Sequence, residues 1–464
     1  MEESHNKRMN RRWSRLDNTA KIFPSTVEKT DTRVFRISCE LQEEIDPDLL
    51  QQAVDHAIKG FPNFRCIMKK GMFWYYLEQC NLEPLVREEY KQVCAPLYEQ
   101  DRKTLLFEVT YFRKKINLEM FHVIADGTGG VQFFRSIVYD YLSLAHPEQF
   151  QEEQKLLDLD GSVTERASDG FEQYYDKSYK KKEESAKGGE AEALPMPLKK
   201  AYRFHGTRTE DDVLRIIDGI VSVQEVKEVA KRYHTNLTVY LIAVYIQSLY
   251  QTMRIREMQL PVAVSIPVNL RQFFPSDTTK NFFGMMSVVY NFSESSDELP
   301  DIIQAVEETF QRELTKEKMR ERMNKMMKLE NMLVVRVAPL FLKNPVLRYA
   351  RKISNCKEST VFSNVGRIDM PENCVPYIQG FDVYMSTWNV QLTLCSFGDR
   401  MQLGFTSAYE SADIQKNFFR ILSSEGIAVT LRCNGFFQEE ADVVEKQVEE
   451  APKPKRKRTR VKEV

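Results

Sequence analysis

The chain has 464 residues, of which 42% are hydrophobic and 29% charged, and its formal net charge at pH 7 is −1. This length allows a sizeable core and favours two domains. A charge so close to zero provides no overall field that would attract nucleic acid or an anionic membrane, so we expect no specific nucleic-acid partner. The chain has no uninterrupted apolar run of about 18 residues, and a membrane-spanning helix is therefore not predicted.

The eight cysteines are scattered along the chain, and no two of them form a C-x-x-C pair. Several lie inside apolar, strand-like runs, as Cys395 does. Reduced, buried thiols in a cytoplasmic protein are the simplest account of this pattern. The charged residues 1–15 precede no apolar segment of the kind that a secretory signal needs. We therefore expect a cytoplasmic protein.

Strands and helices alternate in the first 150 residues. Apolar residues alternate with polar ones over residues 32–39, which predicts a strand. Asp46 and Pro47 then begin a helix, because Asp is a favourable N-cap and Pro suits the first helical position. Two β-hairpins are also expected in this part of the chain. They join residues 63–69 to 72–78 and residues 104–111 to 116–122.

The composition changes between residue 151 and about residue 200, where Glu, Lys, Ser and Gly dominate. Such a segment has no apolar face of its own to bury, so we expect a polar crossover or linker over residues 151–205. Periodic patterns resume afterwards and define a second structural unit over residues 206–437. The elements expected in this unit are strands at 213–217, 260–268, 285–292 and 427–432, a hairpin joining 384–397 to 401–409, and helices at 222–233, 238–250, 299–332 and 411–425.

The helix expected at residues 299–332 is rich in Met, especially from Met319 onward. Met fills irregular gaps in protein cores and also forms adaptable binding surfaces. We favour packing against the core over a lipid-contacting lip, because an amphipathic helix normally buries its apolar stripe.

Residues 438–464 begin with an acidic block and continue with a basic one, and neither contains an apolar period. The basic run at residues 452–462 has the composition of segments that bind nucleic acid or anionic lipid, or that direct nuclear import. Opposite charge blocks at a terminus are more often solvated and disordered, which is the interpretation that we favour. A weak contact with an anionic membrane through the basic run stays open as the alternative.

The stretch from Phe121 to Gly127, with the sequence F-H-V-I-A-D-G, joins a predicted strand to a predicted helix. A period-2 pattern over residues 116–122 precedes it, and a helical apolar period follows soon after. His122 is thus expected at a strand end, just before the Asp126-Gly127 turn. Such a junction can hold a catalytic base without burying it completely.

The same pattern also has a purely structural interpretation. Asp-Gly is among the commonest turn dipeptides, and a histidine at a strand end is usually a polar residue with its hydrogen bonds satisfied. A metal site is not expected, since His122 and Asp126 alone leave a zinc ion short of ligands and no other His or Cys lies nearby.

Further motifs accompany H-x-x-x-D-G along the chain. They are R-L-D at residues 15–17, F-P-N-F-R at 61–65, I-P-V-N-L-R at 266–271, N-F-F-G at 281–284 and S-N-V-G-R at 363–367. In this order and spacing the set resembles the coenzyme A-dependent acyltransferase superfamily, which includes chloramphenicol acetyltransferase, alcohol acetyltransferases and the condensation domains of peptide synthetases. The chain looks most like the alcohol acetyltransferase and condensation-like branch, and the resemblance extends over about residues 11 to 437.

The resemblance implies an α/β (α+β) fold of two chloramphenicol acetyltransferase-like lobes, each with a mixed sheet flanked by helices. Residues 1–150 would form the N-terminal lobe and residues 206–437 the C-terminal lobe, with an active-site tunnel between them. An acyl-CoA co-substrate would enter from one face, and a small or lipidic alcohol or amine acceptor from the other. No bound cofactor and no metal are implied, and we expect a monomer.

The resemblance also implies roles for individual residues. His122 would act as the general base on the acceptor, because a neutral imidazole can take up a proton near pH 7. Asp126 would point away from the substrate and pair with Arg271, since an Arg–carboxylate pair suits a structural brace better than proton transfer. Gly127 would permit close backbone approach at the turn. The residues implied as tunnel or substrate contacts are Asn269, Asn281, Ser363 and Asn364, the last of which equally suits a structural turn.

Two functional hypotheses remain open. Many condensation domains carry two adjacent histidines, whereas this chain has Phe121 in the first position. No carrier-protein or adenylation segment flanks the region, so we favour a stand-alone acyltransferase of the alcohol O-acetyltransferase kind. The alternative is a condensation-like module that is non-catalytic or that binds a carrier protein. The joint presence of His122, Asp126 and Arg271 favours the enzyme.

Overall fold

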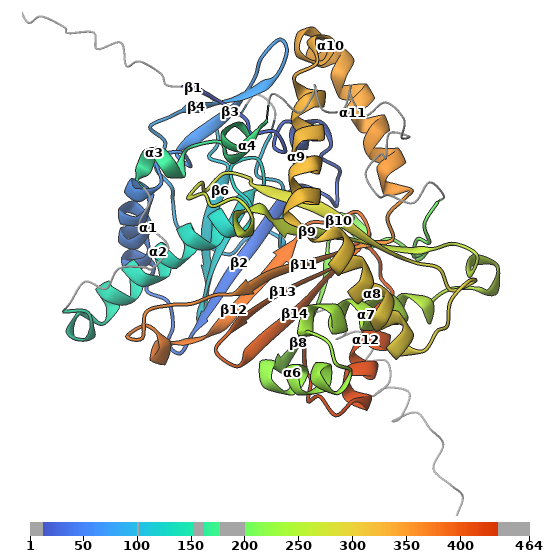
Figure 1. Cartoon of the computed structure of the whole chain (residues 1–464). Coiled ribbons are helices and arrows are strands. Elements are labelled where there is room, and N and C mark those ends of the chain that lie inside the picture. The colour runs from blue at the N-terminus through green and yellow to red at the C-terminus, as the bar shows by residue number, and fades with distance from the viewer. Residues whose placement is uncertain (1–12, 100–101, 152–161, 177–199, 435–464) are drawn as a thin grey trace, which may run out of the picture.

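The structure is a computed structural model that describes residues 13–99, 102–151, 162–176 and 200–434. The described chain forms two lobes, each built on its own large β-sheet and filled by its own hydrophobic core (Figure 1). The α/β fold of two lobes with mixed sheets and flanking helices is thereby confirmed. The predicted tail at residues 438–464 and most of the predicted crossover lie outside the described residues.

The N-terminal lobe has a five-stranded sheet in the order β12-β2-β7-β6-β5, in which only the β5–β6 pair is parallel. Helices α1 and α2 pack against each other beside this sheet, on the left in Figure 1. A small antiparallel sheet, β1-β4-β3, completes the lobe. The elements are β1 (Trp13–Arg15), β2 (Val34–Leu41), α1 (Pro47–Gly60), β3 (Cys66–Lys70), β4 (Tyr75–Gln79), β5 (Arg87–Glu88), β6 (Phe107–Phe112), β7 (Lys115–Phe121), α2 (Gly127–Ala145) and β12 (Ile378–Met385).

Local sequence signals account for several of these elements. The Asp46 carboxylate accepts hydrogen bonds from the backbone N–H groups of Asp48 and Leu49 at 2.9 and 3.1 Å, and α1 begins there as predicted. Both predicted hairpins form, as β3–β4 and β6–β7. In the second of them, Arg113 takes a positive φ of 50° at the turn.

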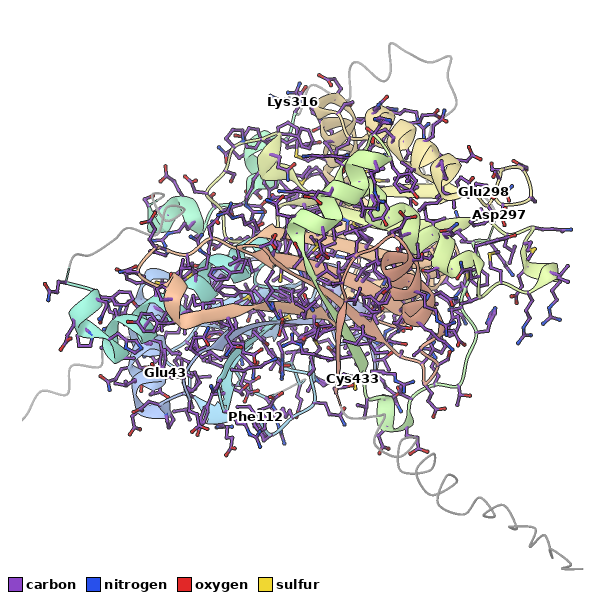
Figure 2. The ribbon with its side chains drawn as sticks, turned by 90° about the horizontal axis from the view of Figure 1, so that it is seen from below. Glu43, Phe112, Asp297, Glu298, Lys316 and Cys433 are labelled. Carbon is purple, nitrogen blue, oxygen red and sulfur yellow. The ribbon has the colours of Figure 1, made fainter. Side chains whose placement is uncertain are left out.

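The C-terminal lobe has a seven-stranded mixed sheet in the order β10-β9-β11-β13-β14-β8-β15. Only β11 runs parallel to its two neighbours, β9 and β13. In Figure 2, which views the molecule from below, Asp297 and Glu298 mark the segment that leads into α8, and Cys433 marks the end of β15. The elements are β8 (Arg215–Ser222), α6 (Val223–Arg232), α7 (Leu237–Tyr250), β9 (Val262–Asn269), β10 (Phe283–Tyr290), α8 (Leu299–Glu313), α9 (Lys316–Glu330), α10 (Leu333–Val337), α11 (Leu340–Asn355), β11 (Thr360–Arg367), β13 (Val390–Phe397), β14 (Arg400–Ser407), α12 (Asp413–Ser424) and β15 (Thr430–Cys433).

The strand predicted over residues 384–397 is wrong, because the chain changes sheets inside it. Residues up to Met385 belong to β12, which pairs with β2 in the N-terminal sheet, whereas β13 begins at Val390 in the C-terminal sheet. Ser386 holds the crossing point: its hydroxyl oxygen accepts from the Val34 N–H at 3.1 Å. Both strands are buried and apolar, so the sequence pattern runs on without a break.

The single helix predicted over residues 299–332 is also wrong, since α8 ends at Glu313 and α9 begins at Lys316. Thr315 separates the two helices, and its side chain accepts from the Lys318 N–H as the N-cap of α9. The expected core packing of the Met-rich part is confirmed for Met319, Met323 and Met327, which are buried in the C-terminal core, whereas Leu329 and Met332 at its end are exposed. Helices α10 and α11 and most of strand β12 were not predicted.

Part of the predicted polar crossover packs against the C-terminal lobe. It contains the short helices α3 (Val163–Arg166) and α4 (Gly170–Tyr174). Phe171 is fully buried and stands edge-on to Phe282, with ring centroids 5.3 Å apart. Phe171, Tyr174 and Tyr175 lie at i, i+3 and i+4, but one helical turn is too short for a periodic pattern to be recognised in a polar segment.

Candidate active site

His122 lies directly after β7, in the short turn that leads into α2. Its backbone N–H donates to the carbonyl oxygen of Arg33 at 2.8 Å, next to the pairing of β7 with β2. Asp126 then begins α2 as its N-cap, and its carboxylate accepts from the Gly129 N–H at 3.0 Å. The structure thus confirms the predicted order of strand, turn and helix around His122.

A cavity of about 540 Å³ lies between the two lobes, and His122 forms part of its wall. The His122 ring contacts Phe23, Phe35 and Phe283, with ring centroids 5.1, 5.3 and 5.6 Å away. Most of the wall is apolar and comes from segments of both lobes. Its other apolar members include Ile22, Phe171, Leu270, Met286, Met319, Met323, Met326, Leu329, Val383, Met385 and Trp388.

Asn281 sets the tautomer of His122. The Asn281 side-chain NH2 group donates to the backbone carbonyl of His122 at 2.9 Å and to the Asp17 carboxylate at 3.0 Å. Because a carbonyl can only accept, the amide oxygen of Asn281 faces the imidazole, where it lies 2.8 Å from Nδ1. Nδ1 therefore carries the hydrogen in the neutral ring and Nε2 carries the lone pair. The described residues place no hydrogen-bond partner at Nε2.

Burial controls the ionisation of this group of residues. It lowers the pKa of His122 below the ordinary value of 6.5, although the Asp126 carboxylate and the hydrogen bond to Asn281 act in the opposite direction. Burial also raises the pKa of Asp17 from 3.8 to about 7. The imidazole of His122 is consequently neutral at pH 7 and able to accept a proton.

Asp126 and Arg271 form the ion pair that the resemblance implied. Nη1 of Arg271 lies 2.8 Å from Oδ2 of Asp126, and Nη2 lies 3.3 Å from Oδ1. The Phe282 N–H also donates to Oδ2 at 2.9 Å, and Nη2 of Arg271 donates to the carbonyls of Thr278 and Lys280, each at 2.8 Å. The contacts of Asp126 fix the start of α2 relative to the C-terminal lobe, and those with Thr278 and Lys280 hold the Arg271 guanidinium in place. None of them involves the imidazole.

The close backbone approach that we expected at Gly127 lies two residues further on. A Cβ atom at Gly127 would meet only the Val365 side chain, at 4.0 Å, whereas one at Gly129 would overlap the carbonyl oxygen of Thr279. Because this overlap is with backbone atoms of Thr279, a larger residue at position 129 would push α2 away from the C-terminal lobe.

Two of the four residues expected as tunnel or substrate contacts lie next to His122 or the cavity. Ser363 lines the cavity wall. Asn281 is fully buried behind His122 and holds the imidazole, so its position is that of a support for the ring.

The other two lie further out. The Asn269 side chain donates to the Thr128 hydroxyl at 3.2 Å, which adds a second link between α2 and the C-terminal lobe. Asn364 is exposed, and its side-chain oxygen accepts from the Gly366 N–H at 2.8 Å. This bond lies inside β11, at the bulge between Asn364 and Gly366, and not in the turn that was the alternative for Asn364.

A charged group in the cavity wall was not predicted. Asp31 pairs with Arg33 at 3.2 Å and with Arg351 at 3.4 Å, and the buried Glu358 lines the same cavity. Asp31 and Arg351 are more than 300 positions apart in the sequence, and no local spacing predicts that they meet. Asp17 was noted only as part of the R-L-D motif, because its segment has no periodic pattern.

Two further observations apply to the described residues only. They contain no group of three or more His, Cys, Asp or Glu side chains that could hold a metal ion together. They also contain no helix with the length and apolar composition to cross a membrane.

Comparisons with known proteins bear on the family and the fold. A family model described as alcohol acetyltransferase matches residues 110–375, which is more than half of the chain. The matched region includes His122, Asp126 and Arg271. A comparison with curated proteins found no match.

Three solved structures share the fold over most of their length. The Fusarium sporotrichioides protein TRI101, complexed with coenzyme A and T-2, is 8% identical with a TM-score of 0.59, covering 88% of this chain and 97% of that chain. The trichothecene 15-O-acetyltransferase TRI3 from the same organism is 11% identical with a TM-score of 0.57, covering 89% and 94%. The first condensation domain of the calcium-dependent antibiotic synthetase is 13% identical with a TM-score of 0.55, covering 90% and 99%. At these identities the likeness concerns the fold alone.

The ion pair can be tested by a double-mutant cycle on stability. Arg271→Ala should lower the free energy of unfolding by about 3–5 kcal/mol, because it leaves the buried Asp126 carboxylate without its partner. The double variant with Asp126→Asn should lose clearly less than the sum of the two single losses, since it removes both charges. Urea unfolding of the four proteins measures this coupling, and strictly additive losses would show that the pair is not the brace.

The tautomer of His122 can be tested by ¹⁵N NMR of the histidine side chains. The native protein should show His122 with its hydrogen on Nδ1. Asn281→Ala removes the acceptor, so this preference should be lost while thermal unfolding still shows a folded protein. Asn364→Ala, an exposed residue of the same type, serves as the control and should leave the His122 signals unchanged. Unchanged signals in Asn281→Ala would rule out the role of Asn281.

Proposed function

Because the chain belongs to the alcohol acetyltransferase family and is an acyltransferase, we propose that it transfers an acyl group from acyl-CoA to the hydroxyl of an alcohol. In this proposal His122 is the general base. The observation that carries it is the hydrogen bond from Nδ1 of His122 to Asn281, which leaves the lone pair on Nε2 in a ring that borders the cavity between the lobes. The structure of TRI101 with coenzyme A supports a CoA thioester as the donor in this fold.

The reaction follows from that lone pair. Nε2 of His122 takes the proton of the acceptor hydroxyl as its oxygen attacks the thioester carbonyl carbon. The tetrahedral intermediate then collapses: the carbon–sulfur bond breaks and an ester or, with an amine acceptor, an amide is formed. The imidazolium returns its proton to the departing CoA sulfur, so free thiol leaves and His122 is neutral again. The apolar wall around the ring limits access of water, which would otherwise compete as the acceptor.

The cavity also narrows the class of acceptor. Its volume of about 540 Å³ lies within the range of small-molecule sites, and its wall is mostly apolar. We therefore propose an alcohol with a substantial apolar part, and Ser363 as one of the polar groups in contact with it. We further propose a cytoplasmic monomer, in keeping with the eight free cysteines.

The second candidate is a condensation-like module that is non-catalytic or binds a carrier protein, and the likeness to the antibiotic-synthetase condensation domain favours it. Phe121, which stands where many condensation domains carry a second histidine, does not decide between the two candidates. Its side chain is buried in the N-terminal core, stacked on Tyr98 with ring centroids 6.0 Å apart, on the other side of β7 from the cavity. A second histidine at this position would therefore not reach the cavity.

Replacing His122 tests the proposal directly. We expect the native protein to release free thiol from at least one acyl-CoA in a screen of donors against alcohols and amines. His122→Ala should lower kcat by about 100- to 10,000-fold, because the general base is lost. His56→Ala, at a largely exposed histidine on α1, is the matched control and should retain full activity. Native-like turnover in His122→Ala would disprove the base, and an inactive native protein would favour the second candidate.

The pH dependence of kcat/KM offers a second test. The neutral imidazole is the active form, so activity should fall as pH decreases through the pKa of His122. Since burial lowers that pKa, the midpoint of the fall should lie below pH 6.5. Measurements of kcat/KM between pH 5 and 8 in a buffer series check this, with circular dichroism as the control for folding. A midpoint above pH 7 would contradict a buried histidine base.

A further inference from the structure

Helix α11 differs from an ordinary surface helix, because the side chains that it turns toward the protein are largely polar. Lys343 is buried: its ammonium group donates to the Phe73 carbonyl at 2.8 Å and lies over the Trp74 ring, 3.5 Å from the centroid. Asn344 accepts from the Ser25 hydroxyl at 2.8 Å. About two helical turns further along, Arg351 pairs with the buried Asp31. The inner face of α11 is thus held mainly by hydrogen bonds and an ion pair.

The outer face of the same helix is apolar. Leu342, Val346, Tyr349 and Ile353 follow one another at i, i+4, i+7 and i+11, which places them on one stripe of an α-helix. Their exposed fractions lie between 43% and 68%. A surface helix of a soluble protein normally turns such a stripe to the core. The stripe therefore has no partner among the described residues.

The apolar surface continues beyond α11. The Leu340 N–H donates to the Met72 carbonyl at 2.9 Å, so the turn between β3 and β4 lies against the start of the helix. This turn, α10 and α11 share the upper rim of the molecule in Figure 1. We refer to the exposed apolar residues of this rim as the apical face. They are Met72, Phe73, Leu329, Met332, Val337, Phe341, Leu342, Val346, Tyr349 and Ile353.

The charged side chains of α10 and α11 all have the same sign. Residues 331–357 contain six Lys and Arg residues and no Asp or Glu, although the whole chain has a net charge of −1. Three of the six, Arg336, Arg348 and Lys352, are exposed. An apolar stripe with aromatic members and flanking basic residues is the composition of helices that lie in the interface of a lipid bilayer. Basic residues in that position are attracted to anionic lipid headgroups.

We propose that the apical face docks this protein on an anionic membrane surface, with α11 lying in the plane of the interface. A protein partner would need matching acidic groups, and a second copy would bring the same basic charge against itself. An anionic lipid surface offers an apolar interior to the exposed stripe and negative headgroups to the basic residues.

The docking also has a consequence for substrate access, which rests on the proposed function. Arg351 and Ser354 of α11 line the cavity between the lobes, as do Met326 and Leu329 of α9. Leu329 belongs to the apical face as well, so the face and the cavity wall are continuous. An acceptor alcohol dissolved in the bilayer would enter the cavity without crossing water.

Vesicle sedimentation of the full chain tests the docking without any activity measurement. Vesicles of phosphatidylcholine mixed with phosphatidylserine should bind the protein at low salt, and vesicles of phosphatidylcholine alone should bind it less. The variant Leu342→Ser/Val346→Ser/Tyr349→Ser should lose binding by about tenfold or more, because its apolar stripe is gone. Arg336→Glu/Lys352→Glu should weaken binding chiefly to the anionic vesicles.

A matched control distinguishes this face from any exposed residue. Ile255→Ser/Arg256→Glu alters an apolar and a basic residue that are both exposed outside the apical face, and it should bind as the native protein does. Equal binding by the triple-serine variant would overturn the proposal. Loss of binding on deletion of residues 438–464 alone would also overturn it, by placing the contact in the tail. A native dimer that the triple-serine variant converts to a monomer would show that a second copy covers the face. Thermal unfolding of each variant verifies its fold.

Discussion

The Asp126–Arg271 ion pair is the contact on which the arrangement of the candidate site depends, because it joins the two lobes where α2 begins. Both side chains are largely buried, with exposed fractions of 7% and 10%. A buried charge that loses its partner costs several kcal/mol, so separation of the lobes at this point is strongly opposed. Arg271 is anchored in turn by the carbonyls of Thr278 and Lys280. The start of α2 and the segment after η5 (Leu270–Gln272) are therefore fixed to each other.

The same segment orients the imidazole. The Phe282 N–H holds the Asp126 carboxylate, and the residue before it, Asn281, holds Nδ1 and the backbone carbonyl of His122. Two consecutive residues of the C-terminal lobe thus position a carboxylate and a histidine of the N-terminal lobe. The nitrogen that carries the lone pair is consequently decided by contacts between the lobes, and the strand that carries His122 does not decide it alone. This explains why Asp126 matters to the site without touching the imidazole.

Sequence patterns predicted the parts of the site whose physics is local. The period-2 run that ends at His122, the Asp126 N-cap and the amphipathic α2 all depend on neighbours within a few residues, and all three are present. The Asp126–Arg271 pair came from the resemblance of ordered motifs, since the two residues are 145 positions apart. The Asp17–Asn281 contact spans 264 positions and involves residue types that are common in turns, so no local pattern could have indicated it. The change of sheet at Ser386 was missed for a related reason: burial in either sheet requires the same apolar residues.

Helix α11 shows that a helical period of apolar residues does not determine which face of the helix is buried. Its apolar residues recur at helical spacing, and the usual inference would place Leu342, Val346 and Tyr349 against the core. In the structure the opposite stripe is inside, because Asn344 and Arg351 find hydrogen-bond and charge partners in the N-terminal lobe and Lys343 finds a carbonyl and an aromatic ring. A helical period fixes the angle between two faces and leaves open which face is inside. That choice is made by the partners offered from elsewhere in the fold. In α11 the partners favour the polar stripe, so the apolar stripe stays on the outer surface of the protein.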